Sequence, residues 1–298
     1  MRSKPFIIVL SLISLVCGVL LVTAQEPGDE VRGAFLSTRP KTTNSNAASR
    51  RRRVRNTNSS SATAKNANST GANANRTANR NSSATHKLAE AMGLGYTLFM
   101  RGANGRSVRV EPSREFHNGD SVRIALEPNV DGYLYVFHTE GNGEPEMIYP
   151  DWRLDGGENW IEAHVPVEIP SSEETDERLR WFTFYGNAGI ERLYVVVSRE
   201  PLPGVPTGDR LVTFCAANKD KCPWRPLSEV WAQLQNATRA EVKVVSAKSF
   251  GQPLSDKEQV ATTRGLGLDQ TAPEPSVIRM NASTNAPVLV AVLDLIHK

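Results

Sequence analysis

Apolar and polar residues alternate with a period of two through most of the segment 96–198. Alternation of this kind is typical of β-strands that bury one face. A Gly-Ala-Asn-Gly turn at 102–105 separates the first two alternating segments and predicts a hairpin. Turn residues also separate the later segments, which predicts an antiparallel sandwich or barrel. The expected strands are 96–101, 107–111, 121–127, 133–139, 146–149, 160–165, 179–185 and 192–198.

The pattern changes after residue 201. One segment has apolar residues at the spacing i, i+3, i+4 and i+7, namely Leu227, Val230, Trp231 and Leu234. This spacing predicts a helix over 226–237. Two further strands are expected at 242–245 and 288–295, with a polar, proline-containing stretch at 251–276 between them. Because the last strand is strongly apolar and must be covered, we expect one mainly β body over 87–298, an antiparallel β-sandwich-like domain with one or two short helices.

The N-terminus has the features of a secretory signal. Arg2 and Lys4 precede an apolar run at 6–22, and small residues lead up to Ala24. We expect residues 1–24 to be a signal peptide that is removed after export. The alternative is an uncleaved membrane anchor, since a run of this length can cross a bilayer. Both interpretations place the rest of the chain outside the cytoplasm, either periplasmic or secreted.

Charge is distributed unevenly behind this signal. Residues 31–86 contain eleven lysines and arginines and no acidic residue, whereas residues 87–298 contain 22 basic and 29 acidic residues. The segment 41–85 is rich in Asn, Ser, Thr and Arg and has almost no large apolar residue. Because such a composition cannot bury enough apolar surface to fold, residues 25–86 are predicted to form a disordered basic linker.

The densest charge in this linker is the run RRRRVR at 50–55. In an exported protein we expect no nucleic acid as its partner. Anionic envelope polymers or lipid head groups are the expected partners, and a solvated linker or a protease-processing site is the alternative. Membrane contact is expected only through an uncleaved signal or through this basic tail.

Three cysteines are present, and Cys17 leaves with the predicted signal. The remaining pair, Cys215 and Cys222, is expected to form a structural disulfide in an oxidising compartment. Redox-active pairs usually have two residues between the cysteines, whereas six separate these two.

Motifs for catalysis or for cofactor binding are absent from the sequence. There is no Gly-x-Ser-x-Gly elbow, no His-Glu-x-x-His pair and no phosphate-binding glycine loop, and the histidines are scattered. We therefore expect no catalytic residue, no cofactor and no metal. The acidic turn at 151–159 could suggest calcium, and a solvated turn is the preferred interpretation. The segment 181–185 is aromatic on both faces, so both faces must be covered or one must meet a partner.

Residues 116–204 resemble the domain of unknown function 4384 (DUF4384) family. The matching residues open or end the expected strands: Gly119, Asp120, Asp131, Gly132, Tyr133, Pro150, Pro170, Gly189 and Glu191. The resemblance implies a β-rich module of bacterial envelope or multidomain proteins to which no activity is assigned, and it gives these residues structural roles. Residues 205–298 are a C-terminal extension beyond the resemblance.

These features favour an exported, non-enzymatic binding or interaction module of the cell envelope, with a protein or an anionic envelope polymer as partner. The alternative is a cell-envelope hydrolase that acts on wall or glycan material. Polar residues gathered in one deep pocket would favour the enzyme, and a flat aromatic or acidic surface would favour the binding module. In a third interpretation the acidic domain folds back on its own basic segment.

Overall fold

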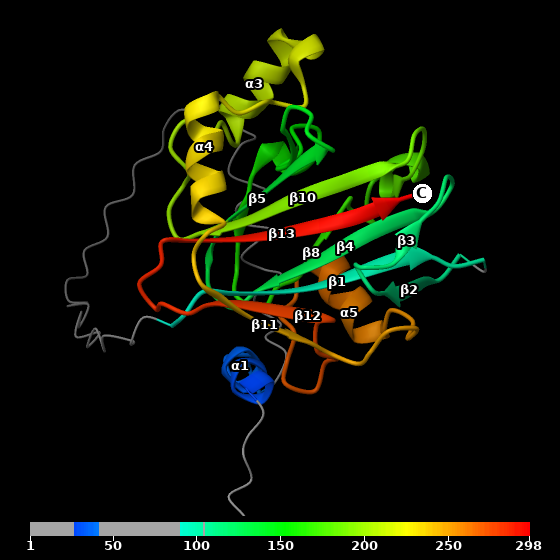
Figure 1. Cartoon of the computed structure of the whole chain (residues 1–298), viewed down its shortest axis with the longest axis vertical. Helices are drawn as coiled ribbons and strands as arrows, with labels where there is room; N and C mark the ends of the chain where they lie inside the picture. Colours follow the sequence, from blue (N-terminus) through cyan, green and yellow to red (C-terminus); the bar gives the residue numbers. More distant parts are fainter. Residues whose placement is uncertain (1–26, 42–89, 104) are drawn as a thin grey trace, which may run out of the picture.

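The computed structural model describes residues 27–41, 90–103 and 105–298, which form two packed β-sheets with helices on both outer faces (Figure 1). Sheet A contains, in spatial order, β11 (Val242–Ser246), β12 (Val277–Asn281), β1 (Gly93–Arg101), β4 (Ser121–Pro128) and β8 (Val167–Ile169), with β2 (Ser107–Val110) beside β1 and β9 (Phe182–Thr183) beside β4. Sheet B contains β3 (Glu115–Phe116), β13 (Val288–His297), β10 (Gly189–Ser198), β5 (Gly132–Glu140) and β6 (Glu146–Tyr149), with β7 (Trp160–Ile161) beside β5.

All strand pairs in the described sheets are antiparallel except β3 and β13. The α-helices are α1 (Pro27–Leu36), α3 (Asp209–Ala217), α4 (Ser228–Ala237) and α5 (Asp256–Arg264). Short 3-10 turns are η1 (Asp155–Gly157), η2 (Glu177–Arg180) and η3 (Lys219–Lys221). The predicted mainly β fold is confirmed, with four short helices in the described part of the chain instead of one or two. Within these same residues, no helix is long and apolar enough to span a bilayer.

The main core lies between the two sheets. Alternate residues of the central strands point into it, including Leu98 of β1, Leu126 of β4, Val136 of β5 and Val195 of β10. All four side chains are almost completely removed from solvent. Burial of apolar side chains between two inward-facing sheet surfaces is the dominant stabilising contribution in a sandwich.

The outer face of sheet B is also apolar. Tyr135 and Phe137 of β5 and Val196 of β10 pack against residues of α3 and α4 in a second core. Their strands are therefore apolar on both faces, because each face is covered.

The outer face of sheet A has a different composition over β1, β2 and β4, where several polar and charged side chains are buried. Arg123 and Glu127 of β4, Thr97 of β1 and Arg109 of β2 are each no more than a few per cent exposed. Helices α1 and α5 lie on this side of the sheet (Figure 1). The alternation of β4 therefore predicts the correct inward face, but its polar face is covered instead of solvated.

The predicted linker over 25–86 is wrong for residues 27–41, which form α1 and a segment packed on sheet A. Val31 and Phe35 lie one helical turn apart, and they pack against β12. Phe35 fits there because Gly93 and Gly95 of β1 have no side chain, and a Cβ at either position would lie only 3.0–3.1 Å from its ring. The signal peptide predicted at 1–24 and the linker residues 42–86 lie outside the described residues.

Candidate functional site

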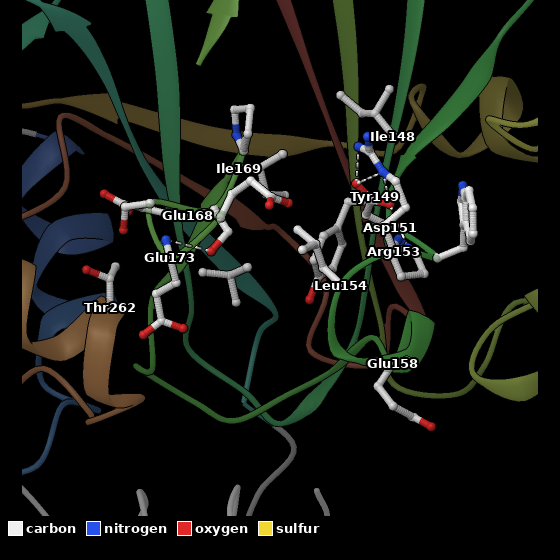
Figure 2. Close-up of a pocket in the computed structure, with 18 of the residues that line it drawn as sticks. Ile148, Tyr149, Asp151, Arg153, Leu154, Glu158, Glu168, Ile169, Glu173 and Thr262 are labelled. Atoms are coloured by element: carbon white, nitrogen blue, oxygen red, sulfur yellow. Dashed lines mark hydrogen bonds and ion pairs between the residues drawn. The ribbon is translucent and has the colours of Figure 1, made fainter. Parts of the chain in front are cut away.

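A large open cleft, with a volume of about 1730 Å³, lies where the edge strands of the two sheets meet (Figure 2). Strand β6 is the last strand of sheet B and β8 is the last strand of sheet A, and both contribute to the lining. The segment that connects them supplies most of the other lining residues. One end of the cleft is formed by α3 and residues 222–224, and the other by residues 262–265 at the end of α5.

Two prolines define the edges of this cleft. Pro150 directly follows β6 and Pro170 directly follows β8, as the sequence predicts, and each is preceded by a cis peptide bond. Because proline has no backbone N–H, neither strand continues its ladder past these points. The chain is therefore free to leave both sheets and form the walls of the cleft.

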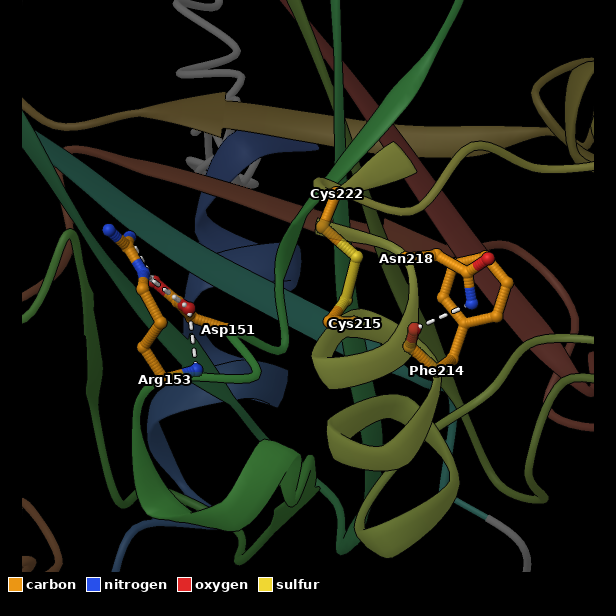
Figure 3. The surroundings of a disulfide bond; sticks show 6 residues. All are labelled: Asp151, Arg153, Phe214, Cys215, Asn218 and Cys222. Carbon is orange, nitrogen blue, oxygen red and sulfur yellow. Dashed lines mark hydrogen bonds and ion pairs between the residues drawn. A yellow bond between two sulfur atoms is a disulfide. The ribbon is translucent and has the colours of Figure 1, made fainter. Parts of the chain in front are cut away.

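The predicted disulfide between Cys215 and Cys222 is present at one end of the cleft (Figure 3). It joins α3 to the segment that carries Trp224, and the Met147 N–H of β6 donates to the Trp224 carbonyl at 2.8 Å. Trp224 and Cys222 both line the cleft. The disulfide thus fixes one wall of the cleft to the edge of sheet B.

The cleft is strongly acidic. Its described lining contains two arginines and eight carboxylates: Asp131, Asp151, Glu158, Glu162, Glu168, Glu173, Glu174 and Asp209. Arg153 is paired with Asp151, with the Nε–Oδ1 distance at 3.0 Å, and this hydrogen bonding raises the pKa of Arg153. Glu158, Glu162 and Glu173 form no ion pair with any described residue.

Glu174 illustrates how this site keeps its negative charge. Its Oε1 accepts hydrogen bonds from the backbone N–H of Asp176 at 3.3 Å and from Thr175, whose N–H and hydroxyl lie at 2.7 and 3.0 Å. These bonds, with the Asp176 N–H first, hold the pKa of Glu174 below its ordinary value. The carboxylate therefore remains charged at neutral pH.

Aromatic side chains are interspersed with the carboxylates. Trp152, Trp160, Trp181, Phe182 and Trp224 line the cleft. Trp160 remains 49 % exposed although its ring contacts Tyr133 edge-on, with ring centroids 5.0 Å apart. The strand predicted at 179–185 is wrong for most of its length, because β9 comprises only Phe182–Thr183 and follows η2.

The aromatic segment 181–185 is divided between the core and the surface. Phe184 stacks on Phe116 in the core with ring centroids 4.8 Å apart, whereas Tyr185 is 75 % exposed. Trp181 packs under the guanidinium of Arg123 at 4.2 Å from its ring centroid. One face of the segment is thus buried, and Trp181 and Phe182 face the cleft.

The predicted family-motif residues occupy turns and strand ends. Gly119 has φ of 93°, a conformation that favours glycine, and the Asp120 carboxylate accepts a hydrogen bond from the His117 N–H at 3.1 Å. Gly132 is required for a different reason, because a Cβ there would lie 2.4 Å from the Ser198 carbonyl oxygen.

The other motif residues hold neighbouring strands together. The Asp131 Oδ1 accepts from the Ala163 N–H at 2.8 Å, next to the Tyr133–Trp160 contact. Gly189 begins β10, and Glu191 on the same strand contacts His138 Nε2 at 2.6 Å. Three of these motif residues also line the cleft, namely Asp131, Pro150 and Pro170.

Within the acidic turn at 151–159, the Asp151 carboxylate forms an ion pair with Arg153. No group of three or more histidine, cysteine or acidic residues that could hold a metal ion occurs in the described part of the chain.

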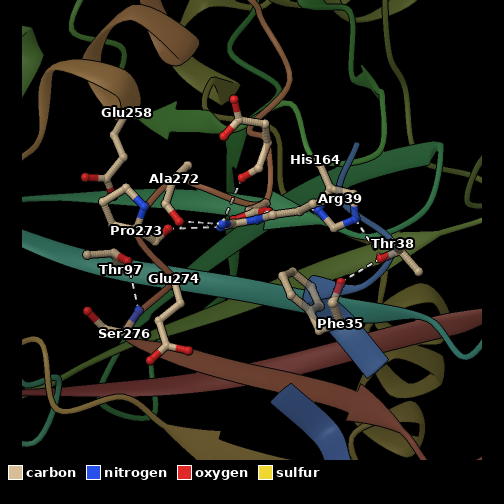
Figure 4. Close-up of polar contacts among 12 residues, drawn as sticks. Phe35, Thr38, Arg39, Thr97, His164, Glu258, Ala272, Pro273, Glu274 and Ser276 are labelled. Carbon is tan, nitrogen blue, oxygen red and sulfur yellow. Dashed lines mark hydrogen bonds and ion pairs between the residues drawn. The ribbon is translucent and has the colours of Figure 1, made fainter. Parts of the chain in front are cut away.

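A buried charged network next to the cleft was missed by sequence reasoning (Figure 4). Glu127 accepts from Arg39 Nε at 2.8 Å and from Arg39 Nη2 at 2.7 Å, and its Oε1 lies 2.8 Å from His164 Nδ1. The other ring nitrogen of His164 lies 2.7 Å from the Thr38 hydroxyl. Burial alone would raise the pKa of Glu127, but its hydrogen bonds with His164 and Arg39 outweigh burial and lower it.

Comparison with known families is informative for only part of the chain. Residues 115–201 match the model of a family described as a domain of unknown function (DUF4384). This match confirms the resemblance derived from the sequence. No curated protein and no solved structure matches the chain.

The folded body extends beyond the residues that match the DUF4384 model on both sides. Strand β10, at the end of the match, pairs over its whole length with β13, and β4 pairs with β1. Both partner strands lie outside the match. In this chain the DUF4384 region therefore supplies most of the cleft, and the flanking sequence completes both sheets around it.

Proposed function

We propose that this protein is an exported, non-enzymatic binding module of the cell envelope, and that the acidic cleft holds its partner. The observation that carries the proposal is the composition of the cleft, where eight carboxylates and several aromatic side chains face about 1730 Å³ of open space. Aromatic side chains are enriched in surfaces that bind another protein, and tryptophan and tyrosine are frequent among the residues that contribute most to binding.

The charge of the cleft bears on the class of partner. An anionic envelope polymer would be repelled by the surplus of carboxylates, because like charges disfavour association. A protein partner is therefore the ligand proposed for the cleft. An anionic polymer remains a hypothesis for the basic run at 50–55 alone.

Export is supported by two independent features. The N-terminal sequence has a basic start, an apolar run and a small-residue site ending at Ala24. The Cys215–Cys222 disulfide forms at one wall of the cleft, and disulfides persist in oxidising compartments such as the periplasm.

The experiment uses a photo-crosslinking amino acid placed at one of two aromatic positions in the full chain, expressed in its native envelope. Trp160 lies in the cleft and is half exposed, and Tyr185 is more exposed but lies outside the cleft. Irradiation should give a defined adduct with one protein from position 160. The matched position 185 should not give this adduct.

The same preparation tests the alternative, a hydrolase of wall or glycan material. The purified chain is incubated with isolated wall fragments and the soluble products are measured. Release of fragments that depends on Glu158 or Glu173, combined with no specific adduct at position 160, would replace the binding module by the enzyme.

A further inference from the structure

Two carboxylates of the cleft lie at the ends of neighbouring strands. Gly132 of β5 pairs with Ile161 of β7, so Asp131, which directly precedes β5, and Glu162, which directly follows β7, are adjacent to the last pair of this ladder. Both residues line the cleft, and neither forms an ion pair with another described residue. Like charges directly opposite each other on neighbouring strands destabilise a sheet. A cation bound between them would remove this repulsion.

A third carboxylate in the cleft is buried and incompletely satisfied. Glu168 of β8 is 8 % exposed, and its Oε2 accepts no hydrogen bond. Its partner is Arg123, whose Nη1 lies 3.6 Å away, which is an ion-pair distance and too long for a hydrogen bond. This oxygen has almost no exposed surface, so Glu168 stays paired with Arg123 in the wall of the cleft and does not itself contact a ligand.

An aromatic ring lies beside the paired carboxylates. Trp160 and Glu162 are two residues apart on the same extended segment, so their side chains leave the same face. Tyr133 contacts the Trp160 ring edge-on, and half of Trp160 remains exposed. Tryptophan is the aromatic side chain that binds cations best, through its ring face.

We infer that the cleft recognises lysine or arginine side chains on an exposed segment of a partner protein, with Asp131, Glu162 and Trp160 holding one cation. This inference rests on the proposed binding function and specifies its ligand. The surplus of carboxylates in the lining and the exposed indole of Trp160 favour the same chemistry: a positively charged hydrogen-bond donor.

The test measures fluorescence anisotropy of labelled peptides added to the full chain. The probes are a Gly/Ser peptide that carries arginines, the same peptide with lysines, and the same peptide with glutamine at these positions. The arginine and lysine peptides should bind at least about tenfold more tightly than the glutamine peptide, and high salt should weaken them.

Substitutions assign this preference to the cleft. Glu162→Gln should weaken binding of the arginine peptide by up to about fivefold, which corresponds to the range for removing one charge from a partly exposed pair. Glu229→Gln is the matched control, because Glu229 is exposed on α4, lies outside the cleft and changes the net charge equally.

Three results would overturn the inference. The glutamine peptide could bind as well as the arginine peptide, or Glu229→Gln could weaken binding as much as Glu162→Gln. A soluble glucosamine polymer could also bind through Glu162 while the peptides do not, which would assign the cleft to a cationic glycan. If a specific adduct still forms at position 160 in any of these cases, the binding module stands and only its ligand class is wrong.

Discussion

The two outer faces of the sandwich are both covered by helices, but they are built from different chemistry. On sheet B, aromatic and aliphatic residues of β5 and β10 pack against α3 and α4. On sheet A, α1 makes an apolar contact with β12, but charged residues of β2 and β4 pair with residues of α5 and of the segment after α1, as in Arg109 with Glu258 and Arg39 with Glu127. Two helical layers of one protein are thus attached in different ways.

The difference determines how each layer tolerates change. Apolar contacts add roughly in proportion to buried area, so the loss of one side chain on sheet B removes one contribution. A buried ion pair contributes little net stability while it is intact, but removal of one partner leaves the other charge buried without compensation. The charged layer on sheet A is therefore expected to be the more sensitive of the two.

The largest effect is expected for Glu127→Ala. It leaves the Arg39 guanidinium, whose side chain is 1 % exposed, without its carboxylate and removes the partner of His164. The free energy of unfolding should fall by about 3–5 kcal/mol. Urea unfolding measures this change, with Glu229→Ala on exposed α4 as the control. A loss below about 1 kcal/mol would show that the network does not hold the segment after α1 in place.

A smaller loss is expected on the apolar face. Leu211 of α3 is almost completely buried against sheet B, and Leu211→Ala removes its packing and leaves a cavity. The expected loss is about 3 kcal/mol, and it should be independent of salt. Leu227→Ala is the matched control, since Leu227 is largely exposed and should lose almost nothing. A salt-dependent loss in Leu211→Ala would contradict the apolar description of this layer.

The disulfide is expected to contribute slightly less to the free energy of unfolding than the Leu211 side chain does. Replacing both cysteines, as Cys215→Ser with Cys222→Ser, should lower the free energy of unfolding by about 2–3 kcal/mol, because the loop they close is short. The wall that carries Trp224 should also loosen. Peptide affinity in the cleft is then expected to fall together with stability. Unchanged affinity would mean that the Met147–Trp224 hydrogen bond alone fixes this wall.

Lowering the pH should destabilise the charged outer layer on sheet A more than the apolar layer on sheet B. The pKa of Glu127 is lowered in the folded protein from a value of 4.5, so its ionised form stabilises the fold above that pH. This stabilisation is lost as the pH falls through the folded pKa, below 4.5. The loss should be smaller than in Glu127→Ala, because a protonated Glu127 still accepts hydrogen bonds from Arg39. Urea unfolding across this pH range should give a shallower dependence in Glu127→Gln, and equal slopes would refute the assignment.

The contrast between the faces also explains what the sequence could predict. Period-two alternation located most strands, because β4 and its neighbours point apolar residues into one core. Alternation alone could not show that the opposite face of β4, with Arg123 and Glu127, is also buried, since burial of a charge depends on partners far away in the chain. Arg39, the partner of Glu127, lies 88 positions earlier, in a tract whose composition predicts disorder.

Some local signals were present and could have been used. Helix α5 begins with a capping box, in which Ser255 and Glu258 bond each other's backbone, and ends at Gly265 with φ of 60°. Both features are visible as residue types in the sequence. The cleft itself could not be predicted, because its carboxylates come from separate loops and meet only where the β6 and β8 edges lie together.

The smallest loss of stability is expected for a surface ion pair that has the same hydrogen-bond geometry as the buried Arg39–Glu127 pair. Arg192 of β10 contacts Asp294 of β13 through both carboxylate oxygens, at 2.6 and 2.9 Å, which matches the way Arg39 holds Glu127. The Arg192 contact lowers the pKa of Asp294, but both side chains are about one-third or more exposed. Asp294→Asn should therefore cost less than about 1 kcal/mol, and added salt should reduce even that. The two pairs share their hydrogen-bond geometry but differ in burial and in the additional His164 contact of Glu127, so the comparison tests whether enclosure in the buried network causes the sensitivity. If Asp294→Asn destabilised the chain as much as Glu127→Ala, the sensitivity of the charged layer would have to come from the pairing geometry instead.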